Sequence, residues 1–183
     1  MTTTETARRA LVADLMFSQR EAGRHEAGGP VDHWVPAGVP EYMQTEEYAG
    51  AVLTAGGPFT DEEAAHAVAD RMVRVSILRT VAVQRRILVT RAGIERPILP
   101  PAAMSRQRAQ LADLARLDHV QLRVLPECVP TWPAGFELLH SVHRVLVEGP
   151  MGGYTPPGPP PRVLDAYRHV FVGLWEASDP YPG

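Results

Sequence analysis

Two short apolar segments joined by a helix constrain the fold of this chain more than any other feature. Residues 86–90 and 120–125 are apolar runs of strand length, and residues 102–117 between them have a helical pattern. A strand–helix–strand unit of this spacing forms a right-handed crossover between parallel strands. We therefore predict that the two strands lie side by side and parallel in one sheet.

A hairpin and a final helix are predicted after this unit. Residues 136–142 and 144–147 are two further apolar segments, close enough together to form a β-hairpin. Residues 154–161 are rich in proline and glycine, which predicts a rigid, non-helical strap. From Val163 the chain is predicted to be helical again, and the tail after Ser178 is expected to fray. The apolar stripe of this last helix consists of Leu164, Tyr167, Phe171 and Leu174.

Helices are also predicted before the first of these strands. Residues 44–54 and 60–79 have helical patterns, and the second range opens with a capping box. Residues 32–40 hold two prolines and a glycine, so we interpret them as an irregular loop that carries His33 and Trp34. The order of elements predicts an α+β fold, with N-terminal helices, a small mixed β-sheet with one βαβ crossover and a C-terminal hairpin, and a covering C-terminal helix.

The N-terminal segment is predicted to be an amphipathic helix set apart from the sheet domain. A Gly-Gly-Pro sequence breaks the chain after it, which divides the chain into the helix (1–27), an α+β domain (28–178) and a tail (179–183). The aliphatic side of the helix must pack on something, and a second copy of the chain would serve. We therefore predict a homodimer.

Composition excludes several classes of site. Cys128 is the only cysteine among 183 residues, so neither an intramolecular disulfide nor a multi-cysteine zinc site can form. The formal net charge is −3, which gives no overall attraction to nucleic acid. No apolar run approaches the length that spans a bilayer, and no secretory signal pattern opens the chain. We expect a cytoplasmic protein.

Several short motifs resemble those of a known family. Residues 39–49 are similar to a proline-glycine-leucine-leucine-glutamine-threonine signature followed by tyrosine and alanine. Further matches are the paired arginines Arg71 and Arg74, the turn 94–97, the strand 120–126, the hairpin segments 136–139 and 145–148, and Tyr167. Together they resemble the C-terminal domain of unknown function of actinobacterial Xre-type helix-turn-helix regulators, such as the WhiJ-like regulators. The resemblance covers about residues 34–177.

The resemblance implies a sensor-like domain and, as a partner, a small protein encoded nearby. The chain departs from the pattern in three ways. The DNA-reading domain is absent, the glycine and leucines of the signature are Glu41, Tyr42 and Met43, and the acidic residue after the first strand is Arg91. These changes leave open whether a pocket of the family has been altered.

Three residues are candidates for proton-transfer chemistry. His140 and His143 flank the predicted hairpin turn, and Glu148 follows the last strand beside flexible glycines. With Glu148 as a third ligand the histidines could hold a metal, but we expect no metal. The alternative is that the histidines serve the turn and that Glu148 accepts hydrogen bonds from loop N–H groups.

Six residues are candidates for ligand binding. If the strands that end near Arg91, Glu127 and Glu148 are neighbours, these charges meet at one sheet edge, where Arg91 could clamp a carboxylate. The alternative is a surface salt bridge. The remaining candidates are aromatic residues that line a pocket or else close the core, namely Trp34, Tyr42, Trp132 and Tyr154.

The expected function follows from these candidates and from what the chain lacks. It contains no phosphate-binding glycine loop, nucleotide fingerprint, Gly-x-Ser-x-Gly elbow or His-Glu-x-x-His sequence, so we expect no cofactor. The first hypothesis is a protein that binds a small molecule or a partner. The alternative is a cofactor-free enzyme of secondary metabolism that catalyses an isomerisation, cyclisation or elimination.

The net charge and the missing recognition helix predict that the chain does not bind DNA specifically. Gel-shift titrations with promoter fragments from its own locus, at low and at moderate salt, should show only weak retardation that salt abolishes. A sequence-selective shift that survives the added salt would contradict this expectation.

Overall fold

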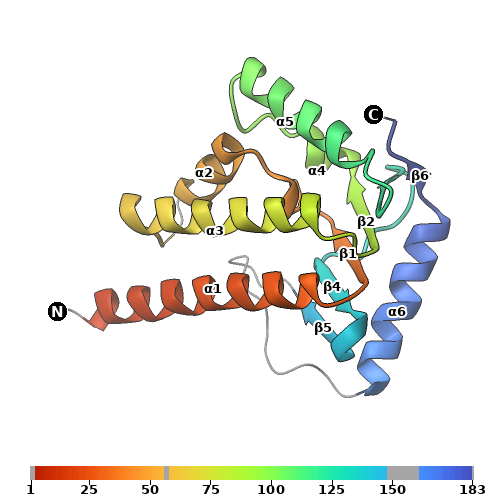
Figure 1. The fold of residues 1–183 in the computed structure, drawn as a ribbon, viewed down its shortest axis with the longest axis horizontal. Helices are drawn as coiled ribbons and strands as arrows, with labels where there is room; N and C mark the ends of the chain where they lie inside the picture. The colour runs from red at the N-terminus through yellow and green to blue at the C-terminus, as the bar shows by residue number, and fades with distance from the viewer. Residues whose placement is uncertain (1–2, 56–57, 148–160, 183) are drawn as a thin grey trace.

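A six-stranded mixed sheet forms the centre of the molecule (Figure 1). The computed structural model describes residues 3–55, 58–147 and 161–182. The strands lie in the order β5-β4-β1-β2-β3-β6. Their bounds are β1 (Val31–Val35), β2 (Arg85–Thr90), β3 (Val120–Leu125), β4 (Phe136–Leu139), β5 (Arg144–Val147) and β6 (Asp179–Pro180). β1, β2 and β3 run parallel, whereas β4, β5 and β6 are antiparallel to their neighbours.

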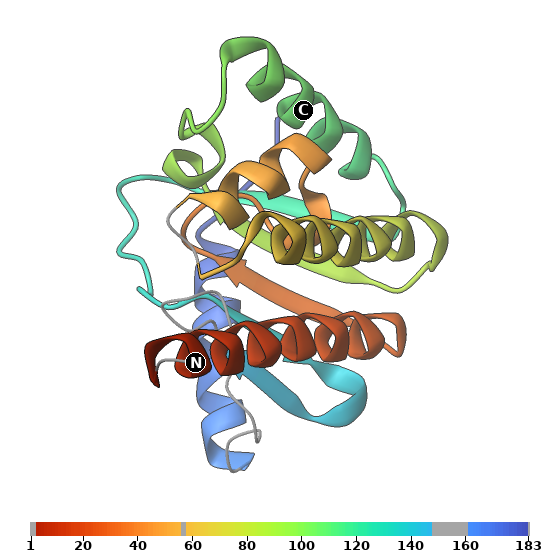
Figure 2. The same cartoon turned by 90° about the vertical axis from the view of Figure 1, so that its left-hand side faces the viewer.

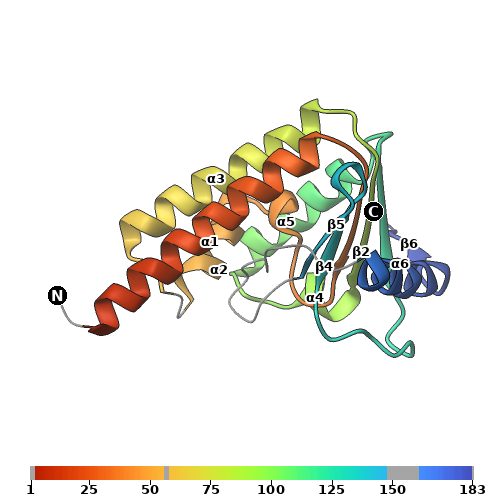
Figure 3. The ribbon, with the colours of Figure 1, turned by 90° about the horizontal axis from the view of Figure 1, so that it is seen from below.

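Helices cover both faces of this sheet, which confirms the predicted α+β class. Figure 3 shows α1 (Thr3–Ala27), α2 (Glu46–Thr54), α3 (Asp61–Thr80) and α5 (Pro101–Leu114) on one side and α6 (Pro161–Glu176) on the other. The parallel pairing of β2 and β3 around α5 is as predicted. Three short elements complete the described part of the chain: the 3₁₀ helices η1 (Glu41–Met43) and η2 (His140–Val142), and α4 (Arg91–Glu95).

Alternation along the strands creates two cores. On β2, Ile87 and Val89 belong to the core beneath α3 and α5, whereas Leu88 belongs to the core beneath α6. The predicted stripe of α6 packs in this second core, where Phe171 is fully buried with Phe136 of β4. Both sheet faces are therefore covered, as is usual where parallel strands form the centre.

The predicted loop over residues 32–40 is wrong in its first part, because β1 occupies the middle of the sheet. Asp32 and His33 interrupt the apolar pattern that marks a strand, yet all five residues of β1 are buried. Both polar side chains have partners from distant parts of the chain. The Asp32 carboxylate accepts a hydrogen bond of 2.6 Å from Arg86 Nε, and His33 Nδ1 lies 2.7 Å from the Tyr42 hydroxyl. Such pairing makes buried polar groups tolerable.

The two ends of the predicted sheet domain also differ from expectation. The tail after Ser178 does not fray: β6 pairs with β3, and Tyr181 N donates to Leu122 O at 3.0 Å. The strand predicted over 136–142 ends at Leu139, where η2 begins the hairpin turn. The predicted strap, residues 154–161, lies outside the described residues except for Pro161, the first residue of α6.

The N-terminal helix packs along α3 of the same chain (Figure 2). Val12 and Leu15 are buried, Arg8 Nη1 lies 2.7 Å from Glu63, and Arg20 Nε lies 2.9 Å from Asp70. The aliphatic side that we assigned to a second copy is thus covered within one chain. The homodimer stays a prediction, but this helix no longer supplies the reason for it.

Candidate functional site

A cluster of charged side chains is buried where α1, α3 and η1 meet the sheet. Its centre is Arg74 of α3, which is only 3% exposed. The Arg74 guanidinium donates to Glu26 of α1 and to Glu41 of η1, and its Nη2 lies 3.5 Å from Glu137 Oε1 of β4. One side chain therefore connects four elements of the fold. We call Glu26, Glu41, Arg71, Arg74, Arg85 and Glu137 the charged cluster.

Two carboxyl groups of the charged cluster respond differently to burial. Burial alone would raise the pKa of Glu41, but the guanidinium groups of Arg71 and Arg74 outweigh it and hold that pKa below its usual value. Burial raises the pKa of Glu137 to about 7, and His33 and Arg74 offset this only in part. Glu137 therefore changes charge near neutral pH.

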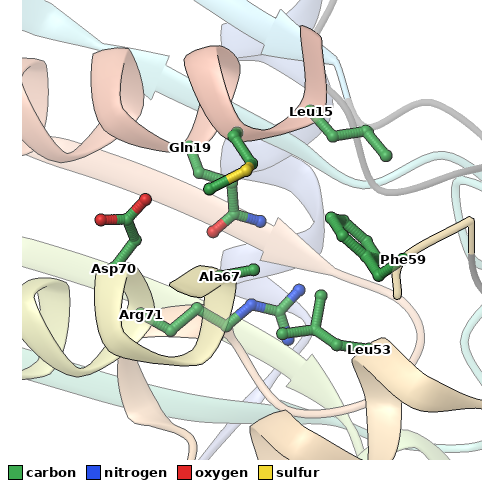
Figure 4. A pocket seen from close by; sticks show the side chains of 8 residues that line it. Leu15, Gln19, Leu53, Phe59, Ala67, Asp70 and Arg71 are labelled. Atoms are coloured by element: carbon green, nitrogen blue, oxygen red, sulfur yellow. The ribbon is translucent and has the colours of Figure 1, made fainter. Parts of the chain in front are cut away.

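A small pocket opens beside the charged cluster, between α1, α2 and α3 (Figure 4). Its walls are apolar, and its polar lining groups are Gln19, Asp70 and Arg71. The apolar lining residues are Leu15, Met16, Leu53, Phe59 and Ala67. Its interior offers about 20 Å³ to the centre of a water-sized molecule, which is room for about one water. An organic ligand therefore requires the elements that line the pocket to move apart.

Arg71 joins the pocket to the charged cluster. It is 5% exposed, and its two terminal nitrogens donate to Gln44 Oε1 at 2.7 Å and to Glu41 Oε1 at 3.2 Å. Its buried Nε has no hydrogen-bond partner among the described residues. Gln19, across the pocket on α1, donates to the same Glu41 oxygen at 2.7 Å. A group that bonded to Arg71 would therefore perturb contacts made by α1.

The aromatic candidates do not gather around this pocket. Tyr42 is fully buried, its ring lies under the guanidinium groups of Arg74 and Arg85, and burial raises its pKa well above the usual value. Trp34 is also fully buried and donates from Nε1 to the carbonyl of Trp132, which is itself exposed. Tyr154 lies outside the described residues. Trp34 therefore closes the core, which was the alternative to lining a pocket.

The predicted cluster of Arg91, Glu127 and Glu148 requires β2, β3 and β5 to be neighbours, and they are not. β5 is separated from β2 by β4 and β1, roughly 14 Å at the usual spacing of strands. Arg91 is exposed and pairs with Glu95 at 3.1 Å, and Glu127 is exposed. Glu148 lies outside the described residues. The predicted grouping at one sheet edge is wrong because β4 and β1 lie between β5 and β2, an order that the sequence does not show.

Neither histidine candidate lines the pocket, and His140 lies on the α6 side of the sheet beside Asp32. His140 Nε2 is 2.8 Å from Asp32 Oδ2, and Arg86 holds the same carboxylate. His143 is exposed in a left-handed turn with φ of 51°. No group of three potential metal ligands occurs within the described residues.

Sequence reasoning missed most of the site that the structure assembles. Arg71 and Arg74 were named from the sequence only as part of the family resemblance. Gln19, Glu26 and Glu137 were not singled out. One signal was present, because two arginines three positions apart interrupt the apolar face of the helix over 60–79. Charged residues on a core-facing stripe require buried partners, which must come from elsewhere in the chain.

The raised pKa of Glu137 predicts a pH-dependent stability. A carboxyl group whose pKa rises on folding destabilises the fold as pH increases from about 4.5 to about 7, because the folded state disfavours its charge. Glu137→Gln cannot ionise, so its stability relative to the parent protein should be higher at pH 8 than at pH 5 in urea denaturation. Glu127→Gln, at an exposed position, is the control, and its stability difference from the parent should be the same at pH 5 and at pH 8. If the stability difference between Glu137→Gln and the parent is the same at pH 5 and at pH 8, the raised pKa of Glu137 is contradicted.

Comparison with known proteins gives a family but no activity. The described helices contain none that is both long and apolar enough to cross a membrane. No curated protein matches the chain. The family model for a domain of unknown function, DUF5753, matches residues 23–180. Because this match covers most of the chain, from the end of α1 to β6, the protein belongs to the DUF5753 family.

Proposed function

We propose that this chain is a cytoplasmic small-molecule-binding protein, related to the sensor domains of actinobacterial helix-turn-helix regulators, that holds its ligand between α1 and the α2–α3 pair. One observation carries the proposal: an apolar pocket ends on a buried guanidinium, Arg71, whose Nε has no partner among the described residues. Apolar walls with a few placed polar groups are the usual composition of a ligand site.

The narrow interior of the pocket supports a sensing role for α1. A ligand enters only if the side chains of α1, such as Leu15 and Met16, move away from Leu53 and Ala67. Gln19 and Arg71 share Glu41, so occupancy also disturbs hydrogen bonds that fix α1. Ligand binding would therefore change the position of α1, and this change would be the signal read by a partner.

A proton-transfer enzyme is the second candidate, and the contact between Asp32 and His140 favours it. A buried carboxylate that holds an imidazole fixes its tautomer and orientation, as in catalytic dyads and triads. The pair lies on the α6 side of the sheet, whereas the pocket lies on the α1–α3 side. Substitution of His140 would therefore separate an enzymatic role from ligand binding at the pocket.

The probe 8-anilinonaphthalene-1-sulfonate, which joins an apolar ring system to an anionic group, tests the pocket. We expect saturable fluorescence enhancement with one site per chain. Met16→Trp enlarges a half-buried side chain that lines the pocket and should weaken binding by about tenfold or more. Phe17→Trp, at the neighbouring exposed position, is the matched control and should bind like the parent protein. Equal binding by both variants would place the probe elsewhere.

A further inference from the structure

We infer that the ligand of this pocket is an apolar monocarboxylic acid whose carboxylate accepts a hydrogen bond from Arg71 Nε. This inference rests on the proposed function and names the chemical class of the ligand. Neither the family nor the resemblance assigns such a ligand. The inference is carried by the hydrogen-bond capacity of Arg71 and its surroundings, the charges that face the pocket, and the apolar walls.

The hydrogen bonds of Arg71 leave one donor for a ligand. Both terminal nitrogens already have acceptors, Gln44 and Glu41, whereas the buried Nε has none among the described residues. An unsatisfied buried donor is costly, and the cost is greater for a charged group. A carboxylate is the acceptor best suited to a guanidinium, since hydrogen bonds between ionised partners are roughly twice as strong as neutral ones.

Arg85 shows that the surplus of donors extends through the charged cluster. It is 1% exposed, and its Nη2 donates to the carbonyl of Glu26 at 2.7 Å. Its Nε and Nη1 have no hydrogen-bond partner in the described part of the chain. Two buried arginines, Arg71 and Arg85, therefore both have donor nitrogens to spare. Of these two arginines Arg71 lines the pocket, so its Nε is the spare donor that a ligand acceptor there can reach.

The balance of charge favours an anion over a neutral acceptor. The charged cluster contains three arginines and three glutamates, and burial raises the pKa of Glu137 to about 7, so one glutamate is only partly ionised at neutral pH. The nearby Asp70 does not supply the missing charge to Arg71, because Arg20 holds it at 2.9 Å. An anion at Arg71 restores the balance, whereas an ammonium group would face a buried guanidinium.

The walls of the pocket specify the rest of the ligand. Leu15, Leu53 and Phe59 offer only hydrocarbon surface (Figure 4), and Met16, which also lines the pocket, has a flexible side chain that adapts to different shapes. The closed interior has room for about one water, so a short chain or a single ring enters only as the lining helices move apart. Burial of that hydrocarbon drives binding, and the carboxylate fixes its direction toward Arg71.

Three probes with the same hydrocarbon body and different head groups test this class. Octanoate, 1-octanol and octylamine would compete with 8-anilinonaphthalene-1-sulfonate on the full chain at pH 7.5. We expect octanoate to bind at least about tenfold more tightly than the other two. In nitrogen-15 spectra, octanoate should shift the Nε–H resonance of Arg71, and octanol should leave it in place.

Two variants keep the outcome unambiguous. Arg71→Lys keeps the positive charge and removes the Nε–H group, so it should reduce the preference for octanoate over 1-octanol; Arg106→Lys, at an exposed arginine paired with Glu47, is the control and should keep the full preference. If the three probes bind with equal affinity and Met16→Trp weakens all of them, the inferred carboxylate group is wrong but the proposed function stands. If no probe binds, both fail. An undiminished preference for octanoate over 1-octanol in Arg71→Lys would overturn the role of Arg71 Nε.

Discussion

The buried guanidinium of Arg74 is the interaction on which the rest of the structure depends. Removal of one partner from a buried ion pair typically costs about 3–5 kcal/mol, because the remaining charge stays in a medium that solvates it poorly. Arg74 has acceptors on α1, η1 and β4, so its charge is satisfied only when these elements assemble together. The position of α1 on the domain is therefore fixed by electrostatics as well as by Val12 and Leu15.

The same arrangement supports the sensing role that we propose for the pocket. Arg71 and Arg74 share Glu41, and Gln19 of α1 donates to that carboxylate as well. A ligand carboxylate that draws Arg71 away from Glu41 changes the contacts of Arg74 and Gln19, which are the contacts that hold α1. Coupling of this kind needs no long pathway, since the ligand bonds to Nε of an arginine whose terminal nitrogen donates to the same Glu41 oxygen as Gln19 of α1.

Local signals in the sequence were sufficient for part of the fold. The β2–α5–β3 crossover and the Thr60 capping box depend on periodicity and on residues three positions apart, and both were predicted correctly. β1 was missed because Asp32 is made acceptable inside the sheet by Arg86 and His140, which lie 54 and 108 positions away. Pairings of this range leave no periodic trace in a single sequence.

The candidate site was predictable to a smaller extent for the same reason. Arg91, Glu127 and Glu148 were grouped on an assumed strand order, whereas the pocket is formed by three helices whose packing no local pattern reports. Arg71 and Arg74 could be recognised as unusual on an apolar helix face, but their acidic partners could not be identified. Sequence alone thus indicates that a buried charge needs a partner, and the structure identifies the partner.

The central claim is that ligand entry moves α1 relative to the rest of the domain. Spin labels at the exposed positions Asp14 on α1 and Arg108 on α5, with Cys128 replaced by serine, report this distance by double electron–electron resonance. Labels at Glu62 on α3 and Arg108 provide the reference pair. The account predicts that saturating octanoate lengthens or broadens the first distance distribution and leaves the reference unchanged. An unchanged first distribution while octanoate is bound would contradict it.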